Sequence, residues 1–266
     1  MALNTEAFSA AERETLRALV ALFGREVLLV GGAALRAHYG LRWRTTDDVD
    51  VYVAARGAEA MAKLRRASWE PTPDRLLGHR WRSPTGCTVD VIPAGMPPGE
   101  QSTQTTGPGS APLNVLGSAA AFRDRRDLEI GRDSSIGVAG AAGLFVLKAS
   151  AYLDAPTVRP HDLQDIAWLL ASHADDDDRR FGDDVLDSGL AHEDAGGFVL
   201  GRDVRSVSDA VESLRIAEWC SFVEEPGRHR LSIMGSNAPG LRLGDDAAAW
   251  ARDKLAAFRR GFDFTA

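Results

Sequence analysis

A short apolar run within the first 40 residues ends in two glycines and sets the first elements of the fold. Residues 27–30 read Val-Leu-Leu-Val, and Gly31 and Gly32 follow at once. An apolar run of this length bounded by glycines predicts a buried strand, and the glycines predict a tight turn. Residues 33–39 suit a short helix that Gly40 ends. The sequence therefore predicts a strand, a turn and a helix in immediate succession.

The next predicted strand carries two acids on one face. Residues 48–53 alternate acidic and apolar side chains, so Asp48 and Asp50 lie two positions apart. Successive side chains of a strand point to opposite faces, and both carboxylates are therefore expected to point the same way. They repel each other unless a cation joins them, and hard oxygen ligands suit Mg²⁺ or Mn²⁺. A solvated edge strand is the alternative interpretation.

A third acid, Asp90, is flanked by valines on a predicted inner strand. An acid in apolar surroundings needs a compensating charge. Joining Asp48 and Asp50 supplies a reason for its position, because three carboxylates can hold two metal ions about 4 Å apart. A buried salt bridge to an arginine such as Arg80 or Arg82 is the alternative.

Groups that favour an anion lie close to these acids in the sequence. Gly31 and Gly32 at a strand-to-helix turn would let backbone N–H groups approach a phosphate. Arg42 and Arg44 stand immediately before the acids and are suited to binding triphosphate oxygens. Surface pairing with Asp47 is the alternative for both arginines.

The charge balance limits the kind of partner. The 266 residues carry a formal net charge of −7, which excludes a broad basic surface for nucleic acid. Residues 1–82 nevertheless hold 13 Lys and Arg against 10 Asp and Glu, a local +3, and the remainder carries −10. The local positive charge is better explained by a triphosphate than by a nucleic-acid surface. The two cysteines, the lack of a secretory signal and the lack of a long apolar run predict a cytoplasmic protein without a membrane span.

The pattern predicts two domains: an α/β unit over residues 1–140 and a mostly helical unit over residues 141–266. The helices of the second unit are expected at 141–153, 160–173, 204–218 and 244–261. Lys148 has apolar neighbours on its helix, and from the residues alone a snorkelling surface lysine is favoured. Asp162 and Asp165 share one helix face, where Asp162 is a candidate cap and Asp165 a better catalytic candidate.

Two blocks of sequence resemble a known superfamily. The first combines the double glycine with Gly40 and the run Arg44-Thr45-Thr46-Asp47-Asp48-Val49-Asp50, and it resembles the DNA polymerase β-type nucleotidyltransferases. The finer pattern is similar to the AbiEii-type enzymes, the toxins of type IV toxin–antitoxin pairs. The second block is similar to that family's lysine helix and Asp-rich helix: Ile136-Gly137-Val138-Ala139, Leu144-Phe145-Val146-Leu147-Lys148-Ala149, and Arg159-Pro160-His161-Asp162-Leu163-Gln164-Asp165-Ile166.

The resemblance covers roughly residues 27–170 and implies a fold, an activity and a site. The fold is α+β, with a minimal nucleotidyltransferase mixed sheet flanked by helices and a mostly helical C-terminal domain. The activity is transfer of a nucleoside monophosphate from an NTP to an acceptor with release of pyrophosphate. The implied residues are Asp48, Asp50 and Asp90 as metal ligands and catalytic acids, Lys148 and Asp165 as further catalytic residues, and Gly31, Gly32, Arg42, Arg44, Thr46 and Lys148 as nucleotide ligands.

The partners implied are the NTP, Mg²⁺ or Mn²⁺, an acceptor that is a tRNA, a protein or a small molecule, and a cognate antitoxin. Gly32 and His161 depart from the family pattern, which has Ser at the first position in many active members and Lys or Arg at the second. The missing hydroxyl motivates an alternative, a catalytically inactive member that binds a nucleotide or a partner protein. A phosphohydrolase that uses the same acids is a further alternative.

Overall fold

The structure is a computed structural model that describes residues 3–40, 48–72, 78–106, 110–175, 178–241 and 245–264. The chain divides between Gly140 and Ala141 into two compact units, and each is described by itself. Three residues predicted to bind the nucleotide, Arg42, Arg44 and Thr46, lie outside the described residues.

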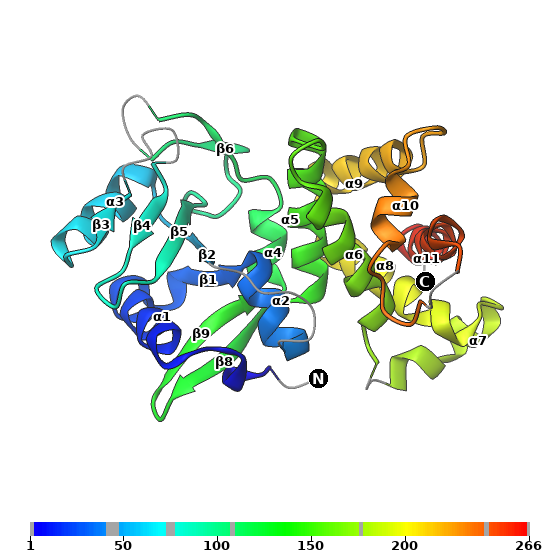
Figure 1. The fold of residues 1–266 in the computed structure, drawn as a ribbon, viewed down its shortest axis with the longest axis horizontal. Helices are drawn as coiled ribbons and strands as arrows, with labels where there is room; N and C mark the ends of the chain where they lie inside the picture. Colours follow the sequence, from blue (N-terminus) through cyan, green and yellow to red (C-terminus); the bar gives the residue numbers. More distant parts are fainter. Residues whose placement is uncertain are drawn as a thin grey trace. The chain divides into compact units, whose positions relative to one another are not determined.

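The first unit is built on a mixed sheet (Figure 1). Among the described residues, seven strands form it in the order β3-β4-β5-β2-β1-β9-β8. Central β1 is antiparallel to β2 and parallel to β9, while β2 is parallel to β5. The strand bounds are β1 Val27–Val30, β2 Asp48–Val53, β3 Glu70–Pro71, β4 Arg80–Arg82, β5 Thr88–Pro93, β8 Arg125–Gly131 and β9 Ser134–Ala139.

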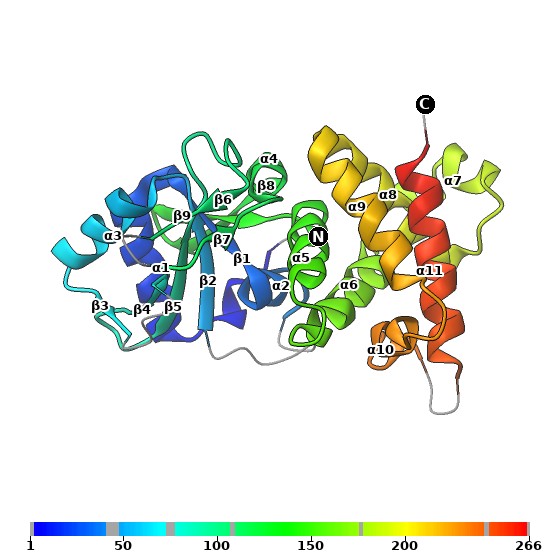
Figure 2. The same ribbon diagram turned by 90° about the horizontal axis from the view of Figure 1, so that it is seen from above.

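Helices flank this sheet, which makes the unit α+β as predicted (Figure 2). Ser9 and Glu12 form a capping box that starts α1, whose buried side chains include Leu16 and Leu19. Helix α1 packs against β1, β8 and β9, and α2 packs against β1, β2 and β9. The helices are α1 Ala10–Phe23, α2 Gly31–Tyr39, α3 Gly57–Arg66 and α4 Ser118–Arg123, with short 3₁₀ turns at Thr5–Ala7 and Gly24–Glu26.

Helix α2 follows β1 without an intervening loop, and a partly buried ion pair holds it against α1. The Arg36 guanidinium donates to Glu12 over 2.5 Å, and the Arg36 side chain is 8% exposed. Gly40 ends α2 with a φ of 73°, the conformation that favours glycine after a helix. The N-terminus of α2 is thereby fixed beside the end of β1.

The second unit is helical in its described part, as expected. A stacked pair of rings, Phe145 on α5 and Phe258 on α11, lies at its core with Trp219 of α9 edge-on to Phe145. The helices are α5 Ala141–Asp154, α6 Pro160–Ser172, α7 Asp183–Asp187, α8 Ala195–Val207, α9 Ala210–Val223, α10 Arg230–Gly235 and α11 Ala247–Phe262, with 3₁₀ turns at Asp178–Phe181 and His192–Asp194.

The structure corrects three details of the predicted elements. The single helix expected at 204–218 is two helices, because Asp209 and Glu212 form a capping box that starts α9 after α8 has ended. Strand β8 and helix α4 were not predicted. A small antiparallel pair of β6 Thr103–Gln104 and β7 Leu113–Asn114 was not predicted either.

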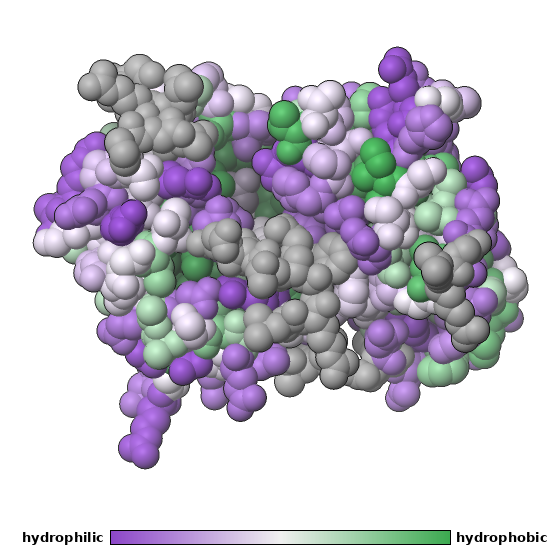
Figure 3. Space-filling model, viewed as in Figure 1, coloured by the Kyte–Doolittle hydropathy of each residue, from purple (hydrophilic) through white to green (hydrophobic). Residues whose placement is uncertain are grey.

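In the part of the chain that the structure describes, every helix is too short or too polar to cross a membrane. The face drawn in Figure 3 carries mainly hydrophilic residues, with apolar residues in small separate patches.

Candidate functional site

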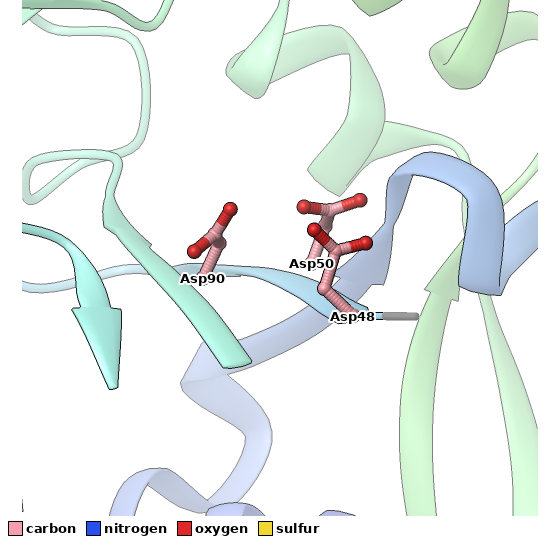
Figure 4. Close-up of side chains that lie close together, drawn as sticks. All are labelled: Asp48, Asp50 and Asp90. Atoms are coloured by element: carbon pink, nitrogen blue, oxygen red, sulfur yellow. The ribbon is translucent and has the colours of Figure 1, made fainter. Parts of the chain in front are cut away.

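The three predicted acids come from two neighbouring parallel strands. Asp50 on β2 pairs in register with Asp90 on β5, and Asp48 pairs with Thr88. Residues paired across strands point to the same face, as do residues two apart on one strand. All three carboxylates therefore share one face of the sheet, and Figure 4 shows their side chains close together.

The cluster has the composition of a metal site. One carboxylate oxygen from each of Asp48, Asp50 and Asp90 lies within 4.8 Å of the others. Asp90 is buried at 7% exposure, and the other two acids are partly buried. Three hard oxygen donors this close fit Mg²⁺ or Mn²⁺ and could hold a metal ion.

Gly31, the first residue of α2, lies against this cluster. Val30 pairs with Asp50 across β1 and β2, so Gly31 follows directly beside that acid. The φ of Gly31 is 61°, and a Cβ at this position would lie 2.0 Å from Asp50 Oδ2. Two features require glycine at this position: the positive φ and the close approach of the Asp50 carboxylate. Gly32 is buried in the first turn of α2.

An arginine lies on two of the three acids. Arg80 begins β4 and pairs in register with Asp90. Its Nε donates to Asp90 Oδ1 over 2.7 Å and its Nη2 donates to Asp90 Oδ2 over 2.8 Å. Nη2 also donates to Asp48 Oδ2 over 3.0 Å. The hydrogen bond to Asp90 and the charges of the acids raise the pKa of Arg80 further above its ordinary value, although burial opposes this.

The salt bridge named as the alternative for Asp90 is thus present, with Arg80 as the partner. It coexists with the clustering of the three acids, so the two interpretations do not exclude each other. Strand β4 reads Arg-Trp-Arg, and this alternation places Arg80 on the same face as Asp90. The contact with Asp48 was not predicted, because it depends on the order of the strands in the sheet.

The remaining predicted residues meet in the second unit. Lys148 on α5 donates to Asp162 over 3.1 Å and to Asp165 over 2.5 Å, and both acids lie on α6. The lysine side chain is 6% exposed and both aspartate side chains are 0% exposed. The interpretation of Lys148 as a snorkelling surface lysine is wrong, because the two acids draw its ammonium into the interface between α5 and α6. Asp165 binds this lysine directly.

Asp162 gives stability that depends on pH. Burial alone would raise its pKa, but the charges of Lys148 and Arg159 outweigh burial and hold the pKa below the ordinary 3.8. A carboxyl with a depressed pKa stabilises the fold fully above its unfolded pKa and loses this effect as the pH falls through the folded value.

We therefore expect the free energy of unfolding to fall as the pH is lowered below about 3.8. The Asp162→Asn variant should show a shallower fall, by up to about 1.4 kcal/mol per pH unit for one proton. Urea unfolding followed by circular dichroism between pH 6 and pH 2 measures both slopes. Equal slopes in the wild type and the variant would contradict this assignment.

Comparison with known proteins adds little to this geometry. No family model matches the sequence, and no curated protein matches it. Among solved structures, the chain is similar to one described as "putative nucleotidyltransferase from H. pylori", with 12% identity and a TM-score of 0.38. The match covers 95% of this chain and 94% of that chain. At this identity and TM-score the likeness assigns neither a family nor an activity.

Proposed function

We propose that this chain is a metal-dependent nucleotidyltransferase that moves a nucleoside monophosphate from an NTP to an acceptor and releases pyrophosphate. The observation that carries the proposal is the cluster of Asp48, Asp50 and Asp90 on adjacent strands, with oxygens within 4.8 Å of one another. Its position beside the turn at Gly31 supports the proposal, because a strand-to-helix turn offers backbone N–H groups to a phosphate.

Each acid has a defined part in this proposal. Asp48, Asp50 and Asp90 hold Mg²⁺ or Mn²⁺, which when bound neutralises phosphate charge and lowers the pKa of an attacking hydroxyl. Asp90, the most buried of the three, completes the site or accepts the proton of the acceptor hydroxyl. Gly31 has no side chain and so leaves room for the Asp50 carboxylate in its present position.

The nucleotide ligands proposed are Gly31, Gly32, Arg42, Arg44, Thr46 and Lys148. The arginines would bind the triphosphate as forks of N–H donors. Lys148 already binds two buried acids, and Asp165 holds its ammonium in one place. We propose that this pairing fixes the lysine for phosphate binding, which makes Asp165 a positioning residue.

The finer assignment is to the AbiEii-type toxins. It rests on the resemblance of the glycine turn and the Arg-x-Thr-x-Asp-x-Asp run. The acceptor is then a tRNA, a protein or a small molecule, and the partner is a cognate antitoxin. An adjacent gene for a small antitoxin-like protein would favour this assignment over a modifying enzyme.

The contacts of Arg80 favour a second candidate function. In it the chain is a catalytically inactive protein of the same fold that binds a nucleotide or a partner protein. The guanidinium compensates Asp48 and Asp90 from within the chain, so these acids are stable without a metal ion. In that case calorimetry would detect NTP binding, no transfer would occur, and alanine at the acids would leave the function in cells intact.

The test is transfer from NTP labelled at the α-phosphate and, in parallel, at the γ-phosphate. Each of the four NTPs is incubated with Mg²⁺ and with a tRNA pool, cell proteins or small hydroxylated acceptors. We expect α-label on one acceptor class and pyrophosphate as the other product. Free phosphate in place of pyrophosphate would indicate a phosphohydrolase instead.

A further inference from the structure

One contact in the carboxylate cluster has no part in the nucleotide transfer proposed above. The Arg80 guanidinium forms a fork on Asp90, with Nε on one oxygen at 2.7 Å and Nη2 on the other at 2.8 Å. The same Nη2 lies 3.0 Å from Asp48 Oδ2. One nitrogen therefore joins two carboxylates that come from different strands.

A cation that joins Asp48 Oδ2 and Asp90 Oδ2 competes with Nη2, which already binds both oxygens. Mg²⁺ binds carboxylate oxygens at about 2.0–2.1 Å, well inside the distance of a hydrogen bond. A metal ion between Asp48 Oδ2 and Asp90 Oδ2 would collide with Nη2, and the two positive charges would repel each other at this range. The arginine and the bridging metal ion thus exclude each other.

We propose that Arg80 is an internal counter-cation of the carboxylate cluster and that the divalent cation displaces it on binding. The inference rests on the metal site of the proposed function. It adds that Arg80 must leave the acids when the cation binds. With the metal ion absent, Arg80 keeps the acids from repelling each other. With the metal ion bound, the guanidinium moves toward solvent.

The burial of the side chains is consistent with this exchange. The Arg80 side chain is 33% exposed, whereas that of Asp90 is 10% exposed. The arginine therefore reaches water by rotating its own side chain, and the buried acid stays in place. Asp50 faces Gly31 on the other side of the cluster.

The opposite role for Arg80 makes the opposite prediction. An arginine that only held Asp90 in orientation would support the metal ion, and its loss would weaken metal binding. A competing arginine weakens metal binding while it is present, and its loss strengthens it. The sign of the change in metal affinity decides between the two roles.

The experiment is Mn²⁺ binding to the full chain, measured by calorimetry and by electron paramagnetic resonance with no nucleotide added. We expect Arg80→Gln to lower the Kd for Mn²⁺ by at least about tenfold, because the metal ion no longer displaces three charge-assisted hydrogen bonds. The control is Arg82→Gln, since Arg82 is exposed, lies two residues on along β4 and pairs with Thr88. It removes the same charge nearby and should change the Kd much less.

A second variant and a second measurement cover the case in which Arg80→Gln does not fold. Arg80→Lys keeps the charge but loses the fork, and it should also bind Mn²⁺ more tightly than the wild type. In the wild type, the Nε–H resonance of Arg80 should move toward that of a free guanidinium as Mg²⁺ is added.

Metal affinity that is unchanged or weaker in both Arg80 variants would overturn the proposal, as would an Nε–H resonance that Mg²⁺ does not move. These measurements do not use the transfer reaction. A chain that exchanges Arg80 for a metal ion but transfers no nucleotide would contradict the proposed function and leave this inference standing.

Discussion

Replacing Lys148 by methionine is expected to lower the free energy of unfolding by about 3–5 kcal/mol, the cost of removing one partner from a buried ion pair. The ammonium binds Asp162 and Asp165, whose side chains are 0% exposed. Methionine fills a similar volume but leaves two buried carboxylates without that charge. Urea unfolding at pH 7 measures the effect.

The chain offers a matched control and a rescue for this prediction. Lys63 on α3 pairs with Glu59 at 3.3 Å with a side chain that is 29% exposed, so Lys63→Met should cost less than about 1 kcal/mol. Adding Asp165→Asn to Lys148→Met removes one of the uncompensated charges and should recover part of the loss. If Lys148→Met lowers the free energy of unfolding by less than about 1 kcal/mol, the ion pair does not stabilise the second unit.

Replacing Gly31 by alanine is expected to cost roughly 2–5 kcal/mol, the sum of backbone strain at positive φ and of overpacking. The φ of Gly31 is 61°, and the new Cβ would lie 2.0 Å from Asp50 Oδ2. Relief of the collision requires the Asp50 carboxylate to leave the position in which it clusters with the other two acids. The variant should therefore also lose Mn²⁺ affinity, which calorimetry measures.

Gly24→Ala separates these two costs. Gly24 also has a positive φ, 58°, but a Cβ there would meet no atom within 4 Å. It should cost only the strain, about 1–2 kcal/mol, and should leave Mn²⁺ binding unchanged. Equal losses of stability and of metal affinity in the two variants would contradict the role given to Gly31.

Local pattern was enough to predict the carboxylate cluster. Alternation along β2 placed Asp48 and Asp50 on one face, and the apolar neighbours of Asp90 marked its strand as an inner one. Both predictions use the two-residue period of a strand and the apolar character of buried residues, which a short stretch of sequence reveals. The roles of these acids in catalysis stay a prediction.

Two features of the structure depend on tertiary contacts and could not be predicted from the local sequence pattern. The ammonium of Lys148 is buried because α6 brings two acids to it, and the apolar neighbours on α5 alone favoured a surface position. The contact of Arg80 with Asp48 depends on β5 lying between β4 and β2. The break before α9 could have been predicted from the sequence, since Asp209 and Glu212 have the spacing of a capping box.

Nucleotide transfer by a variant that lacks two of the acids tests whether a carboxylate-held metal site is the centre of the reaction. The Asp48→Ala/Asp50→Ala variant is compared with the wild type and with Glu70→Gln, which changes an exposed acid of the same sheet. The readout is α-phosphate label on the acceptor with Mg²⁺ present. We expect incorporation by the wild type and by Glu70→Gln, and none above background by the double variant. Equal incorporation by all three proteins would contradict a carboxylate-held metal site as the centre of the reaction.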